Sequence, residues 1–199
     1  TLRLAIGALG LLVIAKLFVQ EFSFLKLIRN KTIWIMGIGV AGYQAFFFIG
    51  TGLTGVAIGT LSSLALAPLM AGLLSWFWQG VVPSKIWWRS TVIAVCGLVV
   101  LSWSGLDDSK INLIGVLASL CAGAAYAVYT VVGVKLSQSG IAATSVLATS
   151  FSIGAFVLLL LSGNQIGQVL QGNGIWLALW LGLGATTLAY VLFGIGISS

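Results

Sequence analysis

The sequence predicts an all-α membrane protein, and three observations carry that prediction: its composition, its apolar segments and the placement of its charges. The 199-residue chain is 60% hydrophobic and 6% charged, whereas a soluble domain carries about 25% charged residues. Its mean hydropathy of +1.17 is correspondingly high. So few polar side chains cannot cover a fold that is surrounded by water, and lipid is the expected environment.

Seven apolar segments are each close to the length of about 20 residues that crosses a bilayer as a helix. They are residues 2–19, 33–50, 56–78, 87–104, 113–135, 145–161 and 175–197. Tryptophans lie near the ends of these segments, where amphipathic rings prefer the headgroup layer. We therefore expect seven transmembrane helices.

The basic residues fall mainly on one side of the membrane if the chain crosses it at each segment. Seven of the nine lie at or beside the loops 20–32, 79–89 and 135–142, and these are Lys16, Lys26, Arg29, Lys31, Lys85, Arg89 and Lys135. Such a bias marks the cytoplasmic side. We predict a multi-pass protein of the cell membrane, typical of the bacterial inner membrane, with these three loops in the cytoplasm.

The net charge of +6 does not indicate nucleic-acid binding. The basic residues are spread over loops that flank the membrane, and no basic face with base-reading side chains is formed. We expect the lipid bilayer as the partner of these residues, and no nucleic acid. Residues 21–31 mix apolar and charged side chains, so they are expected either to lie along the inner membrane surface or to form a frayed helix end.

Small residues recur at every fourth position of the fifth span, at Gly115, Ser119, Gly123 and Ala127. Side chains of this size let two helix backbones approach closely. Gly55 and Gly59 repeat the spacing in the third span. We expect a tight helix–helix seam along each, although 26 glycines in one chain also produce this spacing by chance.

The residue types that are absent exclude several kinds of membrane enzyme. There is no histidine, so a serine–histidine protease cannot be built. The three acidic residues, Glu21, Asp107 and Asp108, all lie in loops, which leaves an aspartyl protease or a carboxylate proton relay without its groups. The last span holds no lysine for a retinal Schiff base. We expect no enzyme, no cofactor and no metal site.

Uncharged polar and aromatic residues inside the spans are the candidate binding residues. We predict a cavity lined by Tyr43, Gln44, Ser63, Tyr126, Thr187 and Tyr190. A buried amide needs a partner or a water-filled cavity, and a tyrosine offers both an apolar ring and a donor. The alternative is that these groups only hold helices together through hydrogen bonds. Pro68 breaks the hydrogen-bond ladder of the third span and is expected to shape it.

Four runs of the chain resemble the EamA-type transporters of the drug/metabolite transporter superfamily. They read GIGVAGYQAFFFIG at 37–50, AIGTLSSLALAPLM at 57–70, GVLASLCAGAAYAVYT at 115–130 and ATTLAYVLF at 185–193. The likeness covers nearly the whole chain, through motifs that are largely apolar. It implies ten helices in two inverted five-helix repeats, with a small-molecule substrate passing through a cavity between the halves.

Under this resemblance, residues 1–104 are helices two to five of the first repeat and residues 105–199 are helices six to eight of the second. The chain begins inside one apolar span and stops inside another, so we expect a fragment that lacks the first helix and the last two. The function implied is a secondary transporter that exports small organic metabolites, such as amino acids, by alternating access.

A second hypothesis is a non-transporting membrane scaffold or assembly subunit. It predicts a closed interior in which the polar side chains bond to neighbouring helices, whereas a carrier predicts a cavity that water can enter. A homodimer is left open under either hypothesis. A membrane-embedded enzyme comes third, because histidine and buried acids are missing.

Overall fold

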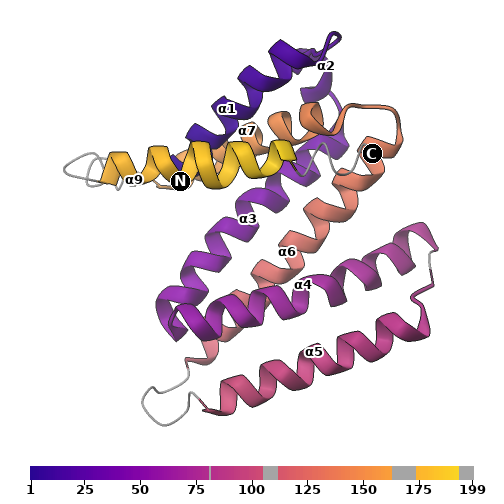
Figure 1. Ribbon diagram of the computed structural model, residues 1–199, viewed down its shortest axis with the longest axis vertical. Helices are drawn as coiled ribbons and strands as arrows, with labels where there is room; N and C mark the ends of the chain where they lie inside the picture. Colours follow the sequence, from indigo (N-terminus) through magenta and orange to yellow (C-terminus); the bar gives the residue numbers. More distant parts are fainter. Residues whose placement is uncertain (81, 105–111, 163–173, 193–199) are drawn as a thin grey trace. The chain divides into compact units, whose positions relative to one another are not determined.

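The computed structural model describes residues 1–199 except 81, 105–111, 163–173 and 193–199. Helices make up nearly all of the described chain, and none of the described residues forms a strand (Figure 1). The loop with Asp107, Asp108 and Lys110 lies outside the described residues. The predicted all-α membrane fold is confirmed.

All seven predicted segments form helices where the structure describes them. The elements are α1 Leu2–Phe18, α2 Phe24–Ile28, α3 Lys31–Thr54, α4 Val56–Gln79, α5 Lys85–Ser104, α6 Leu113–Gln138, α7 Ala143–Ser162, α9 Gly174–Trp180 and the π-helix η2 Leu181–Leu188. Five helical segments are long and apolar enough to cross a membrane, namely Lys31–Thr54, Val56–Trp78, Leu113–Gln138, Ala143–Leu161 and Gly174–Leu192. The other two predicted spans form α1 and α5.

The chain divides into two compact units. One comprises Thr1–Ala41 with Val132–Ser199, and the other comprises Gly42–Val131. The long helices α3 and α6 therefore each contribute one part to each unit. The predicted division into repeats at residues 104 and 105 concerns a different property, the family's internal symmetry, and it stays a prediction.

In the unit of Thr1–Ala41 and Val132–Ser199, α1 packs against α7 and against the π-helix η2. Glycines allow this close approach: a Cβ built on Gly7 would lie 2.8 Å from the Cβ of Thr186, and one on Gly182 would lie 2.7 Å from the Cβ of Ile6. The start of α3 meets α7 in the same way, at Gly37 and Gly154. Small residues thus make the close helix contacts of this unit possible.

The unit of Gly42–Val131 is organised by the small-residue face of α6. A Cβ on Gly115 would lie 2.7 Å from the Leu53 Cβ of α3, and one on Gly123 would lie 2.6 Å from the Ser63 carbonyl oxygen of α4. Ser119 packs directly against Gly50. The predicted seam along the fifth span is confirmed, and its partners are α3 near the start of α6 and α4 farther along.

The predicted seam of the third span is right at Gly59 and wrong at Gly55. A Cβ on Gly59 would lie 2.8 Å from the Thr51 Cα, so α4 begins tightly against the end of α3. Gly55 has open space around it and a φ of +84°, a backbone conformation that favours glycine. It is the single residue that joins the two helices, and its role is the reversal of the chain.

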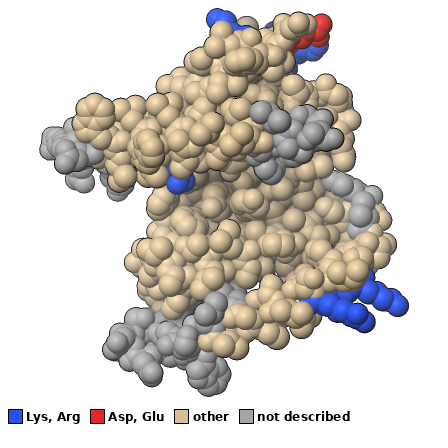
Figure 2. Space-filling model, viewed as in Figure 1, with Lys and Arg blue, Asp and Glu red and all other residues tan. Residues whose placement is uncertain are grey.

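Helix α4 continues through Pro68 to Gln79. It packs against α5, the next helix in the chain. The Trp87 ring of α5 lies directly over Gly72 of α4, where no larger side chain would fit. Most other side chains of α5 are exposed in the structure. Charged side chains occupy only small patches of the face in Figure 2, and uncharged residues form the remainder of what is described there.

Candidate substrate-facing residues

Three tyrosines of α3 and α6 form a ring cluster within the unit of Gly42–Val131. The ring centroids of Tyr43 and Tyr126 are 5.4 Å apart with planes at 71°, and those of Tyr126 and Tyr129 are 4.8 Å apart at 66°. The Tyr43 and Tyr129 centroids are 6.3 Å apart. Tilted and edge-to-face pairs at these distances are favourable contacts between aromatic rings. The structure thus brings together two of the predicted site residues, Tyr43 and Tyr126.

Helical spacing explains why this cluster forms. Residues three apart on one helix share a face, so Tyr126 and Tyr129 both turn toward α3. Phe47 follows Tyr43 by four residues on α3 and extends the cluster, with ring centroids 5.7 Å apart. Tyr129 is 5% exposed, while Tyr43 and Tyr126 are half-buried. The cluster therefore has a packed side and an accessible side.

The Tyr126 hydroxyl belongs to the accessible side. No hydrogen bond joins this hydroxyl to another residue of the described chain. Thr130, one turn later, donates its hydroxyl to the Tyr126 carbonyl oxygen at 2.8 Å and is thereby satisfied within the helix. Of these two hydroxyls, that of Tyr126 is the one whose donor is available to another molecule.

Gln44 and Ser63 lie in the same unit and are both buried. Gln44 is 9% exposed and has an interaction partner within the protein. Ser63 is 1% exposed, and its hydroxyl donates to the Gly59 carbonyl oxygen at 2.8 Å. This intrahelical bond satisfies the Ser63 donor. The close approach of Gly123 to the Ser63 backbone explains why glycine stands at position 123.

Thr187 and Tyr190 lie in the other unit. The Thr187 hydroxyl is placed 3.0 Å from the Gly182 carbonyl oxygen and 3.3 Å from that of Gly7, and the residue is buried. The Tyr190 ring packs edge-on against Phe151, with centroids 4.5 Å apart. Four of the six predicted residues thus belong to one unit and two to the other, and the shared cavity stays a prediction.

The π-helix accounts for the bonding of Thr187. In a π-helix the carbonyl of residue i lies near residue i+5, and both Thr186 and Thr187 donate to carbonyls five residues earlier, at Leu181 and Gly182. A local helix widening of this kind is frequent at functional sites. Segment length and apolarity, which predict the helices, do not distinguish this π-helix from an ordinary α-helix.

Tyr129 is the residue of the aromatic cluster that the predicted set leaves out, although it lies in the same helical run as Tyr126. The signal that identifies it is its i+3 spacing from Tyr126, which places both rings on one helix face. The described residues contain no cluster of histidine, cysteine or acidic side chains able to hold a metal ion.

The chain is 35% identical over 168 residues to a protein described as an uncharacterized transporter, YwfM, of Bacillus subtilis (strain 168). The matched region is 83% of this chain and 56% of that protein, so the chain spans little more than half of the relative's length. No family model matches the chain, and no solved structure matches it.

Proposed function

We propose that this chain forms part of a secondary transporter, of the EamA type in the drug/metabolite transporter superfamily, that exports small organic metabolites such as amino acids across the cytoplasmic membrane. The similarity to a protein described as a transporter supports the class, and the runs at 37–50, 57–70, 115–130 and 185–193 support the family. Two inverted repeats and alternating access belong to the same proposal.

The observation that carries the proposal is the tyrosine cluster on α3 and α6. It places three aromatic rings and the unbonded Tyr126 hydroxyl together within the apolar spans. Aromatic faces attract an ammonium group, and a phenol hydroxyl can donate to a carboxylate. A zwitterionic amino acid offers both groups, and its binding would require no charged side chain inside the membrane.

A specific observation also favours the scaffold alternative. Ser63, Ser119 and Thr130 donate their hydroxyls to carbonyls of their own helices at 2.8–3.0 Å. Thr187 donates to the Gly7 carbonyl of another helix at 3.3 Å, so all four donors are satisfied within the protein, as expected if none of them binds a substrate. The alternative predicts that no water reaches Tyr126. Accessibility of this position therefore separates the two functions.

Transport by the full-length protein in liposomes tests the proposal. Efflux or uptake of a panel of radiolabelled amino acids is compared between the wild type and Tyr126→Phe, which keeps the ring and removes the hydroxyl. We expect a higher KM for the transported amino acid in the variant. Phe46→Leu, at an exposed position of α3, serves as the control and should transport normally. Absence of transport of every panel member by the wild type would contradict the substrate class.

Cysteine labelling tests the scaffold alternative directly. The native cysteines, Cys96 and Cys121, are both exposed, so they are first replaced by alanine. A cysteine at position 126 or 44 is then treated with a small, charged thiol reagent in native membranes. A carrier predicts labelling at position 126 that substrate slows. Complete protection from the reagent at both positions would favour the scaffold.

A further inference from the structure

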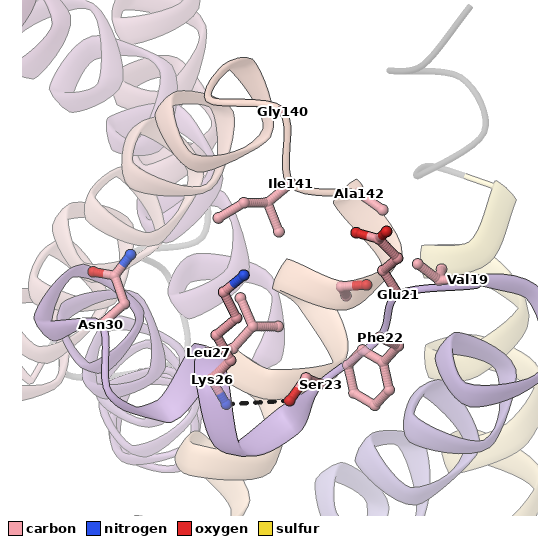
Figure 3. A pocket seen from close by; sticks show the side chains of 11 residues that line it. Val19, Glu21, Phe22, Ser23, Lys26, Leu27, Asn30, Gly140, Ile141 and Ala142 are labelled. Atoms are coloured by element: carbon pink, nitrogen blue, oxygen red, sulfur yellow. Dashed lines mark hydrogen bonds between the residues drawn. The ribbon is translucent and has the colours of Figure 1, made fainter.

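A cavity of about 380 Å³ lies among residues of the unit Thr1–Ala41 and Val132–Ser199, and none of the six predicted site residues lines it. Three segments form it: the turn that follows α1, helix α2 with the residues after it, and the loop between α6 and α7 with the first turn of α7. Its lining combines charged, polar and apolar side chains, among them Glu21, Phe22, Lys26, Asn30, Ile141 and Ser145 (Figure 3). The volume is within the range of small-molecule sites, about 300–1,000 Å³.

Local sequence determines the shape of this cavity. Ser23 caps the short helix α2 by accepting from the Lys26 backbone N–H at 3.4 Å, which turns the chain back after Glu21. Asn30 ends the turn by accepting from the Thr32 N–H at 2.9 Å and so leads into α3. On the opposite wall, Gly140 has a φ of +87°. This left-handed residue lets the chain reverse between α6 and α7.

Two opposite charges line the cavity without neutralising each other. Within the described chain, neither the Glu21 carboxylate nor the Lys26 ammonium makes a hydrogen bond or an ion pair. Figure 3 shows both side chains extending toward the loop of Gly140, Ile141 and Ala142 from different sides of the cavity. A ligand that carries both charges could pair with the two side chains at once.

Ser145 provides an independent sign of a missing partner. It is 3% exposed and lines the cavity, and its hydroxyl oxygen has no hydrogen-bond partner among the described residues. A buried polar group left without a partner costs about 1–3 kcal/mol. Other buried hydroxyls of α7 behave differently, because Thr149 and Ser150 both donate to carbonyls one turn earlier, at 2.9 and 2.7 Å. Ser145 is thus available to a molecule in the cavity.

We propose that this cavity binds a zwitterion that carries a primary ammonium and an anionic oxygen group. The ammonium pairs with Glu21, the anionic oxygens pair with Lys26, and the Ser145 hydroxyl bonds to the ligand. The first turn of α7 adds a positive helix end beside the anionic group. Phe22, Leu27 and Ile141 contact the hydrocarbon part. Two sources share this chemistry: a free amino acid and the headgroup of phosphatidylethanolamine.

The proposal does not rest on the transport function, because none of the six residues predicted to bind the transported substrate lines this cavity, and its occupancy is measured without transport. The full-length protein is purified in detergent and titrated with leucine in a calorimeter. It is also placed in nanodiscs of phosphatidylcholine with or without phosphatidylethanolamine, and the lipid it retains on extraction is measured by mass spectrometry. Leucine binding that Glu21→Gln weakens and Tyr126→Phe leaves unchanged identifies a free amino acid in this cavity, and selective retention of phosphatidylethanolamine identifies a headgroup. Failure of both probes overturns the proposal.

Substitutions of the lining residues test whether the ligand binds in this cavity. Glu21→Gln and Lys26→Gln should each weaken binding of the active probe at least tenfold, and Ser145→Ala should weaken it severalfold. Lys31→Gln is the matched control, because Lys31 is an exposed lysine of the same region that does not line the cavity. An equal effect of Lys31→Gln, or a loss of leucine binding in Tyr126→Phe with none in Glu21→Gln, would show that the ligand binds elsewhere.

Discussion

The Thr187 hydroxyl lies 3.3 Å from the carbonyl oxygen of Gly7, a residue 180 positions earlier in the chain. The contact joins the first described helix to the last one. It is possible because Gly7 and Gly10 have no side chains: the Thr186 and Thr187 side chains occupy the space where a Cβ would stand. A hydroxyl predicted to face a substrate therefore has a partner within the protein.

Replacing Thr187 by valine should destabilise the protein. Valine keeps the shape of the side chain and removes the donor to Gly7 and Gly182. Hydrogen bonds between membrane helices contribute about 0.6 kcal/mol on average and up to about 1.7, so we expect a loss of this size. The measurement is the free energy of unfolding by denaturing detergent in mixed micelles.

Thr144→Val is the matched control, since the Thr144 side chain makes no hydrogen bond to any described residue. It should leave the unfolding free energy nearly unchanged. If Thr187→Val proves equally harmless while it alters the KM for a transported substrate, Thr187 serves binding and the Gly7 contact adds little stability.

Gly123→Ala should disrupt the seam between α6 and α4. The added methyl would lie 2.6 Å from the Ser63 carbonyl oxygen and 3.3 Å from the Ala67 nitrogen, both of them backbone atoms. Overpacking of this kind costs about 1–3 kcal/mol. Thermal unfolding followed by near-ultraviolet circular dichroism should show a lower Tm.

The control for the seam is Gly97→Ala, which has open space around its new methyl. It should keep the wild-type Tm or raise it slightly, since alanine forms helix more readily than glycine. An equal fall in Tm for both substitutions would mean that the close approach at Gly123 is not what makes glycine necessary.

Gly55→Ala should destabilise the connection between α3 and α4 through backbone strain alone. Its φ of +84° and ψ of 158° lie in a region that residues with a Cβ rarely adopt, although the space around it is open, and such a conformation costs about 1–3 kcal/mol. Gly52→Ala offers a comparison three residues earlier, because Gly52 also has open space and lies within the helix α3. Unfolding in mixed micelles should distinguish the two, with only Gly55→Ala losing stability.

Charge placement predicts the orientation of the loops. With Cys96 and Cys121 replaced by alanine, cysteines at Ser84 or Ser139 should react with an impermeant thiol reagent only after the inner face is opened to it. A cysteine at Asp108 should react in intact cells. The reverse pattern would place the basic loops outside, against the charge bias.

Sequence patterns predict the helices well because length and apolarity decide them. The segment predicted at 113–135 forms α6 Leu113–Gln138, and that at 56–78 forms α4 Val56–Gln79. Helix partners are harder to predict, since Gly115 and Gly123 share one face and yet contact different helices. The small residues permit close approach, but they do not specify which helix approaches.

The candidate site likewise combines features that the sequence predicts with features that it does not. Helical periodicity and position within the apolar spans place Tyr43 and Tyr126 at similar depth in the membrane, and their rings are in contact in the structure. The hydrogen-bond partner of a hydroxyl is harder to predict from the sequence. A serine can donate either to its own helix, as Ser63 does, or to a ligand. The unbonded Ser145 is likewise indistinguishable by type from the bonded Ser150. Only the three-dimensional surroundings separate these cases.

The one-residue connection at Gly55 has a consequence for biogenesis. Helix α3 holds 24 residues and is about 36 Å long, while a single residue reaches less than about 4 Å. The start of α4 therefore stays next to the end of α3 throughout membrane insertion, and this favours insertion of the two helices as one helical hairpin.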